Sequence, residues 1–241
     1  MGVLGAVGLS PEKLEIELNW IDEHVDGKPY GVDVLVPNSY VGKGENLTTD
    51  DLRAMIPQEH REFRADVLEK HDIEANDLRS DAGSQRTEQN SNQVLGAGLD
   101  GAKEVLEVAF SHPIGLVANA LGVPPKWMLD MGKEHNVPVA ALIGAKQHAV
   151  KQVEAGVDII VVSGTEGGGH CGSVSTMVLV PEVRRALKPY GDVPILAAGG
   201  ICTGEQMAGV MAMGADGVWC ASVFLPTTEA ETSDNVKEKM I

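Results

Sequence analysis

The chain has 241 residues, 43% of them hydrophobic and 4% aromatic, which suits one α/β barrel of roughly 250 residues with an aliphatic core. Its formal charge of 19 − 35 = −16 disfavours binding to nucleic acids and anionic membranes, and no apolar run reaches the ~18 residues that span a bilayer. The three cysteines lack CxxC spacing, so neither a disulfide scaffold nor a zinc site is expected, and the expected location is a reducing cytoplasm.

Seven short apolar runs predict β-strands. They lie at Val3–Val7, Gly31–Val36, Ile114–Ala118, Val137–Ile143, Asp158–Ser163, Val193–Ala198 and Gly217–Val223. Each run is apolar on both faces and is followed by a helical pattern, which indicates parallel strands that are buried on both sides.

Helix boundaries are marked by capping residues. Ser10 suits an N-cap and Pro11 suits the first position of the helix after it. Thr203 and Gln206 form a capping-box pattern at the start of a later helix, which Gly214 closes. Two further helices are predicted over roughly Pro125–His135 and Gln147–Ala155.

The alternation of strands and helices is typical of an open doubly wound sheet or of a barrel. Seven strands are one short of a closed (β/α)8 TIM barrel, and the gap would leave two unpaired edges. We therefore expect residues 1–241 to form a single barrel domain that is incomplete, with its first strand and last helix absent. Residues 38–93 are expected to be an insertion after the second strand, with a helix at roughly Thr49–His71, serving as a lid or as a plain surface excursion.

A GxGxxG pattern at Gly96–Gly101 is a weak signal for a dinucleotide site. No strand precedes it, and no acidic residue follows at the usual ~20 positions. A loop that enters a helix over Ala102–Phe110 is the better interpretation.

The most informative stretch runs from Gly167 to Gly172 and contains His170. It follows the fifth strand, and the C-terminal ends of parallel strands are where α/β barrels place their active sites. Glycines let the backbone approach a ligand closely, and the imidazole titrates near neutral pH. The alternative is a flexible loop with an incidental histidine.

Two later strand ends predict a phosphate site. Gly199 and Gly200 end the sixth strand, and Ala221 and Ser222 end the seventh. Barrels often bind phosphate with the loops after their last two strands. The alternative is that the two glycines only form a tight turn.

Two polar residues interrupt or end apolar strands. Asp33 needs a partner or must point into a site, and Asn119 stands at the end of the third strand. Each could contact a ligand or be a structural residue. The remaining histidines share no spacing that suits a metal, so no metal site is expected.

Taken in order, several segments resemble the nitronate monooxygenase family, formerly the 2-nitropropane dioxygenases. These segments are Gly156–Val162 with Gly167–His170, Met177–Val183, Pro194–Ile201 and Gly214–Trp219. Weaker similarity covers residues 2–36 and 114–153, so most of the chain is included.

The resemblance implies a TIM barrel that binds FMN non-covalently and oxidises nitronates with O₂. It implies that Gly168 and Gly169 line the flavin and that Gly199, Gly200, Ala221 and Ser222 surround its phosphate. Ala221 departs from the family, which often has glycine there. A further departure is that the family's flavin-contacting first strand has no equivalent in this chain. Asp33 is a further candidate for cofactor contact, and Asn119 for substrate contact.

The histidine of the family motif maps to His170, which is the expected catalytic and substrate-binding residue. In some family members it removes the α-proton of a neutral nitroalkane, and in others it binds the preformed nitronate. The expected partners are thus a small nitro compound and O₂, with a homodimer as one option. The alternatives are an FMN-dependent NAD(P)H:quinone or enoyl reductase on the same barrel, and a non-catalytic flavin-binding fragment.

Overall fold

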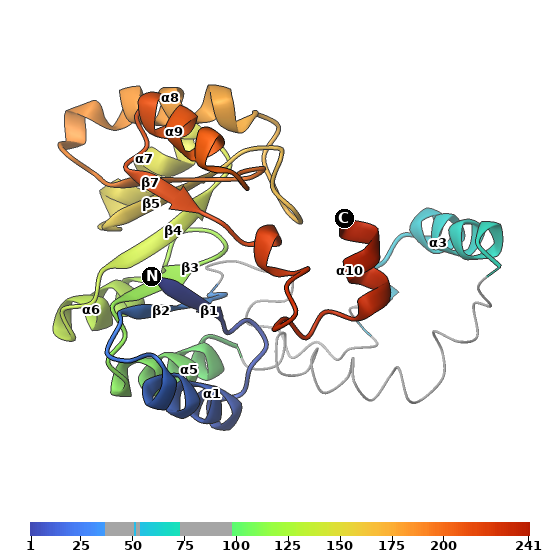
Figure 1. The fold of residues 1–241 in the computed structure, drawn as a ribbon, viewed down its shortest axis with the longest axis horizontal. Coiled ribbons are helices and arrows are strands. Elements are labelled where there is room, and N and C mark those ends of the chain that lie inside the picture. The colour runs from blue at the N-terminus through green and yellow to red at the C-terminus, as the bar shows by residue number, and fades with distance from the viewer. Residues whose placement is uncertain (37–50, 52–53, 73–97) are drawn as a thin grey trace. The chain divides into compact units, whose positions relative to one another are not determined.

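The computed structural model describes residues 1–36, 51, 54–72 and 98–241 (Figure 1). The chain divides into two compact units, which are described separately. The sheet unit comprises Met1–Gly5, Lys28–Asn38 and Ile114–Ile241, and the helical unit comprises Ala6–Gly27 and Ser39–Pro113.

The sheet unit is built on seven parallel strands that are hydrogen-bonded in sequence order, β1 to β7 (Figure 1). The strands are β1 Gly2–Gly5, β2 Tyr30–Val34, β3 Leu116–Asn119, β4 Val139–Ile143, β5 Ile159–Ser163, β6 Ile195–Ala198 and β7 Gly217–Trp219. All seven predicted strands are confirmed. A doubly wound sheet would reverse its strand order at a switch point, so the sequential order is that of a barrel. Among the described residues, no pairing joins β7 to β1.

The last strand is shorter than predicted. It ends at Trp219 rather than Val223, because the backbone turns at Ala221 into the 3-10 helix η2, Ser222–Phe224. A short helix, α10 (Asp234–Met240), follows and was not anticipated.

The central strands β2 to β6 are largely buried on both faces, as predicted, whereas β1 and β7 are only partly buried. One face carries a cluster of small and aliphatic residues with Leu116, Ala118, Ala140, Val161 and Ala198 at its centre. The helices α7, α8 and α9 contact strands β4 to β7.

The helices of the sheet unit follow their strands closely. They are α6 Lys126–Glu134, α7 Lys146–Ala155, α8 Thr176–Leu187, the 3-10 helix η1 Lys188–Tyr190, and α9 Gly204–Ala212. The predicted capping box of α9 is confirmed, since Thr203 and Gln206 exchange side-chain and backbone hydrogen bonds. The bounds of α6 and α7 agree with prediction to within a residue.

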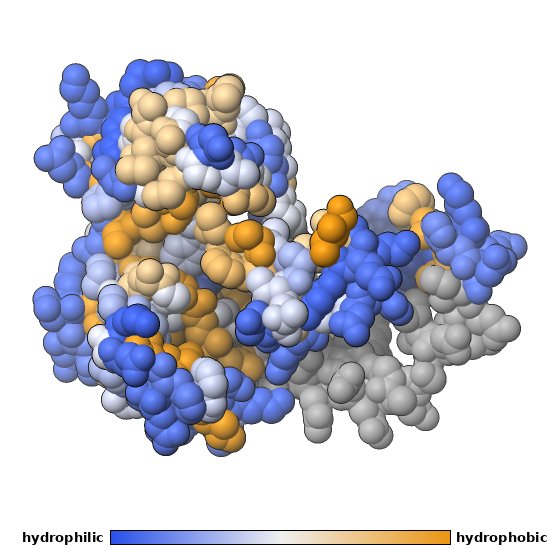
Figure 2. All heavy atoms as spheres, viewed as in Figure 1, coloured by the Kyte–Doolittle hydropathy of each residue, from blue (hydrophilic) through white to orange (hydrophobic). Residues whose placement is uncertain are grey.

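The helical unit contains α1 (Pro11–His24), α3 (Gln58–Lys70) and α5 (Gly98–Ser111). Ser10 caps α1 as predicted, accepting a hydrogen bond from the Lys13 amide at 3.3 Å. The exposed face of α1 is mostly hydrophilic (Figure 2). α1 and α5 contact each other, and His112 joins them through Asp22 at 2.6 Å. Burial alone would lower the pKa of His112, but the hydrogen bonds to Asp22 and to Glu15 raise it.

Of the two expectations for the stretch between β2 and β3, the helix needs correction and the insertion lies mostly outside the described residues. A single helix over Thr49–His71 is wrong, because Pro57 lacks an N–H and precedes a helix that begins at Gln58. The predicted insertion at residues 38–93 lies mostly outside the described residues, as do the first two positions of the GxGxxG pattern. Its last four positions form the first turn of α5, in agreement with a helix entry.

Two aspartates tie neighbouring strands together at their N-terminal ends. Asp158 accepts a hydrogen bond from the Val139 amide at 2.8 Å, and Asp216 accepts one from the Ile195 amide at 2.8 Å. Asp216 also pairs with Arg184, whose guanidinium donates to the Gly214 carbonyl at 2.6 Å. These ties fix the strand register at the end of the sheet opposite to the predicted site.

The segment between β5 and α8, residues 164–175, is held tightly against its neighbours. A Cβ at Gly172 would overlap the carbonyl oxygen of Gly144, in the turn after β4, and a Cβ at Gly164 would overlap the Thr176 backbone. We call this segment the β5–α8 loop. A glycine at each of its ends lets its backbone pack directly on neighbouring backbone.

We expect Gly172→Ala to destabilise the protein by about 1–3 kcal/mol, because the methyl group must displace the Gly144 backbone. Urea denaturation measures the change. Gly209→Ala is the matched control, since a Cβ there meets nothing within 4 Å. It replaces glycine inside α9 and should stabilise by about 0.5–1 kcal/mol. Equal effects of the two substitutions would contradict the close packing of the loop.

Candidate functional site

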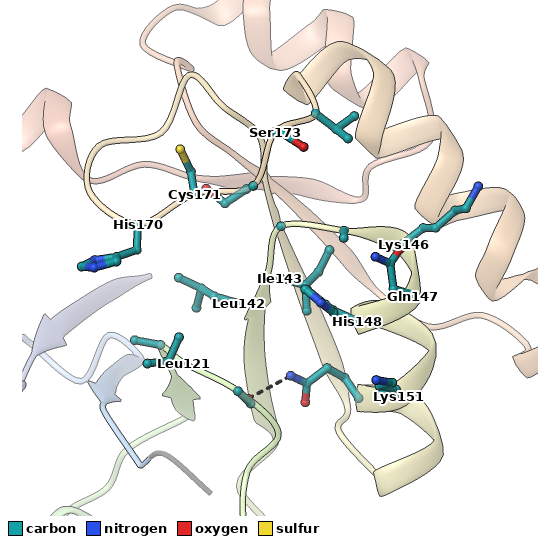
Figure 3. A pocket seen from close by; sticks show the side chains of 18 of the residues that line it. Leu121, Leu142, Ile143, Lys146, Gln147, His148, Lys151, His170, Cys171 and Ser173 are labelled. Atoms are coloured by element: carbon teal, nitrogen blue, oxygen red, sulfur yellow. Dashed lines mark hydrogen bonds between the residues drawn. The ribbon is translucent and has the colours of Figure 1, made fainter. Parts of the chain in front are cut away.

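A pocket of about 770 Å³ lies in the sheet unit at the C-terminal ends of its central strands (Figure 3). Its walls come from the turns after β3 and β4, from the β5–α8 loop, and from α7 and α8. The C-terminal end of a parallel sheet is where α/β barrels carry out chemistry. The pocket is therefore the candidate site.

His170 lines this pocket, as predicted from its place after β5. Its side chain is exposed, and Figure 3 shows the imidazole near Leu142, with Cys171 beside it on the same loop. Within the described part of the chain, no hydrogen bond to the His170 ring is recorded. The ring is thus available to a ligand, while Leu142 gives an apolar surface close to it.

The loop that carries His170 is closed by a carboxylate that the sequence analysis missed. Glu166 Oε2 accepts hydrogen bonds from the Thr176 amide at 2.8 Å and from the Thr176 hydroxyl at 3.0 Å. The N-cap residue of α8, Ser175, makes no side-chain cap of its own. Glu166 therefore caps α8 from ten residues upstream. The Thr176 amide bond is the main reason that the pKa of Glu166 is lowered.

Gly199 and Gly200 lie against this same loop. Both have positive φ, 92° and 70°, which favours glycine. A Cβ at Gly199 would come within 2.9 Å of the Gly167 amide nitrogen, and a Cβ at Gly200 within 2.8 Å of Glu166 Cβ. The turn after β6 thus packs directly on the β5–α8 loop, which gives these glycines a structural reason, while their role in phosphate binding stays a prediction.

The residues predicted to line the flavin, Gly168 and Gly169, and the remaining predicted phosphate residues lie close by. A Cβ placed on Gly168 would be 3.7 Å from Ser222 Oγ, so the glycine run and the end of β7 face each other. Gly169 has φ of 80° and open space around it. Ala221 is exposed at the start of η2. The structure therefore brings the glycine run, the β6 turn and the β7 end together.

The N-terminus of α9 offers fewer free amides to an anion than its position beside these turns suggests. Gln206 Oε1 already accepts hydrogen bonds from the Cys202 amide at 2.7 Å and the Thr203 amide at 3.0 Å. An anion would therefore depend on the turn amides and on Ser222 rather than on this capped helix end.

Asp33 lies on β2 in register with Gly5 and Ala118, so its side chain shares the face of the small-residue cluster. Burial raises the pKa of Asp33 to about 6. Its Oδ1 is buried and has no hydrogen-bond partner among the described residues. A buried carboxyl oxygen that lacks a partner is a plausible contact for a bound group.

Asn119, the predicted substrate contact, is fully buried and engaged with backbone. Its Oδ1 accepts from the Val36 amide at 2.9 Å, and its Nδ2 donates to the carbonyls of Leu121 and Gly122 at 3.0 and 3.2 Å. The structural alternative therefore accounts for Asn119: it shapes the turn after β3, which in turn lines the pocket.

Two other features are absent from the described residues, a metal-binding cluster and a membrane-spanning helix. No group of three His, Cys, Asp or Glu side chains there is arranged to hold a metal ion. None of the helices in the described ranges is long and apolar enough to cross a membrane.

Comparison with known proteins gives a consistent result. A family model described as nitronate monooxygenase matches residues 1–241. The Mycobacterium tuberculosis protein named "Putative monooxygenase Rv1533" is 48% identical over 241 residues, which are 100% of this chain and 62% of that protein.

Two solved structures share the fold. Nitroalkane oxidase from Streptomyces ansochromogenes matches with a TM-score of 0.71 at 22% identity, over 99% of this chain and 62% of that one. A variant of FabK from Thermotoga maritima matches with a TM-score of 0.67 at 22% identity, over 99% of this chain and 58% of that one. The chain thus spans less than two thirds of each of these proteins, and the structural matches confirm the barrel-type α/β fold. Because the family model matches all 241 residues, the chain belongs to the nitronate monooxygenase family.

Proposed function

We propose that the protein oxidises nitronates, and neutral nitroalkanes, with O₂ at the His170 pocket, and that FMN is its cofactor. Family membership gives the coarser statement, a flavin-dependent oxidoreductase. The observation that carries the proposal is the position of His170, unpaired among the described residues, on a loop pinned beside the glycine turn after β6.

The residues around this loop fit a flavin. Gly168, Gly169 and Ser222 offer backbone amides and a hydroxyl next to open space, which suits a phosphate and the edge of a planar ring. The buried, unpartnered Oδ1 of Asp33 lies on the same face of the sheet as Ala118 and offers a further polar contact. We assign cofactor contact to these residues and to Gly199, Gly200 and Ala221 on this basis.

The part played by His170 follows from its protonation state. As the neutral imidazole it can take the α-proton of a nitroalkane, which leaves a nitronate beside an imidazolium. As the imidazolium it attracts the nitronate anion and orients it. The bound flavin supplies the electron acceptor for the oxidation. The protein's own contribution is to hold the substrate carbon at this position and to keep the proton on the imidazole.

A reductase on the same barrel is the second candidate, because the fold is shared with FabK. The two functions differ in electron donor. Steady-state oxidation of NAD(P)H by the flavin-loaded protein would favour the reductase. Reduction of the flavin by a nitronate under anaerobic conditions would favour nitronate oxidation.

The first expected result is optical. The purified protein, or the protein after incubation with FMN, should show absorption bands near ~370 and ~450 nm, as bound oxidised flavins do. Adding propyl-1-nitronate without oxygen should bleach the longer band. A protein that remains colourless after reconstitution would overturn the assignment of the cofactor.

The second expected result concerns His170 as the general base. We expect His170→Asn to lower turnover of neutral nitroalkanes by about 10²–10⁴-fold, the usual worth of general-base catalysis, and to lower turnover of preformed nitronates much less. Oxygen consumption measures both. His60→Asn, an exposed histidine of α3, is the control and should leave both rates unchanged. Equal losses with the two substrates would show that His170 is not the base.

The third expected result concerns Asp33 and the dependence of stability on pH. Its pKa in the folded protein is about 6, above the ordinary 3.8, so the folded state holds this proton more tightly than the unfolded state. Stability should therefore fall as pH rises from about 4 to 6, by up to about 3 kcal/mol in total. Asp33→Asn should remove this part of the pH dependence in urea denaturation. An identical pH profile for both proteins would show that Asp33 is not held protonated by burial.

A further inference from the structure

The side of the pocket formed by α7 carries more basic than acidic side chains, in contrast to the acidic chain as a whole. The lining carries two lysines and two histidines against a single carboxylate, Glu182. The whole chain has a formal charge of −16. Lys146, His148 and Lys151 all come from α7, and Figure 3 shows them on the opposite side of the pocket from His170, with Leu142 and Ile143 between.

These positive groups are only partly neutralised. Lys146 Nζ lies 3.1 Å from Glu182 Oε1, so this lysine already has a counter-charge. Within the described part of the chain, neither Lys151 nor His148 forms an ion pair or a side-chain hydrogen bond. One lysine charge at the pocket wall therefore remains without a partner in that part of the protein.

The N-terminus of α7 adds backbone donors at the same place. Its N-cap residue, Ala145, provides no side-chain cap, and its first turn contains no acidic residue. Gly144 and Ala145 both line the pocket. The first amides of a helix lack intrahelical partners and carry a partial positive charge, so they favour an anion.

The side-chain oxygen of a buried amide in the same wall also lacks a hydrogen-bond partner among the described residues. Gln152 lines the pocket and is 2% exposed. Its Nε2 donates to the Gly122 carbonyl at 2.9 Å, while its Oε1 has no hydrogen-bond partner among the described residues. The bond to Gly122 fixes which end of the amide is the acceptor. A ligand that satisfies Gln152 must therefore present an N–H or O–H group.

The size of the pocket exceeds what a small nitronate requires. Its volume of about 770 Å³ falls in the range of about 300–1,000 Å³ that holds drug-sized ligands. Gly168, which is assigned above to the flavin, also lines the pocket, so the flavin and a small nitronate would share its His170 end and leave the α7 side to water.

We infer that the pocket takes an elongated substrate whose tail carries a phosphate group and a nearby N–H or O–H donor. The phosphate is bound by Lys151, His148 and the α7 N-terminus, and the donor by Gln152 Oε1. The inference rests on the proposed function for the reacting end of the substrate, which lies at His170. A phosphate suits this wall better than a carboxylate, because its additional negative charge and oxygens can engage Lys151, His148 and the first α7 amides together.

Inorganic pyrophosphate tests the anion site without requiring turnover. Isothermal titration of the protein, before and after loading with FMN, should show one binding site of similar affinity in both forms. We expect Lys151→Gln to weaken pyrophosphate binding about 5–10-fold or more, and Lys188→Gln, an exposed lysine of η1 outside the pocket, to leave it unchanged.

Three outcomes would overturn the inference. They are the absence of pyrophosphate binding, equal weakening by both lysine substitutions, and binding that disappears when FMN is loaded. The last would mean that the anion occupies the site of the flavin phosphate. Failure of nitronate oxidation with pyrophosphate binding intact would instead overturn only the proposed function, so the two failures are distinguishable.

Discussion

The hydrogen bonds between Glu166 and Thr176 organise the candidate site. An extended chain could carry His170 to many positions, but the carboxylate that caps α8 closes the β5–α8 loop on itself. The Thr176 hydroxyl lies 3.1 Å from both the Ala198 and Gly199 carbonyls, which connects the same point to the end of β6. Glycine contacts then fix the two ends of the loop. The position of the imidazole is thus set by the backbone packing of three successive strand ends.

Most of the fold could be predicted from the sequence, because parallel strands buried on both faces leave apolar runs that need no tertiary information to recognise. All seven strands, and the caps at Ser10 and Thr203, depend on local pattern alone. The prediction failed where one residue outweighs a periodic pattern, as at Pro57, and at Ala221, where the backbone turns away before the apolar run ends.

The site was predicted less completely, for a physical reason. Strand order brings the ends of β5, β6 and β7 together, so the glycine runs, Ser222 and His170 could be grouped from sequence. The sequence left the role of Asn119 open between ligand contact and structure, because its hydrogen-bond partners are backbone groups that only the folded turn supplies. Glu166 could have been noticed as an acidic residue that shortly precedes a helix without a cap of its own. The wall formed by Lys151 and Gln152 required the rotation of α7, which the sequence leaves open.

The aspartate ties have a consequence of a different kind. Asp158 and Asp216 each follow a glycine two positions earlier, and each binds the first amide of the preceding strand. They act at the opposite rim from the candidate pocket, so they secure the register of two strand pairs without using any residue that lines it. Substitutions in the pocket turns should therefore leave these register contacts intact. The alignment of the strands and the chemistry of the pocket thus depend on different residues.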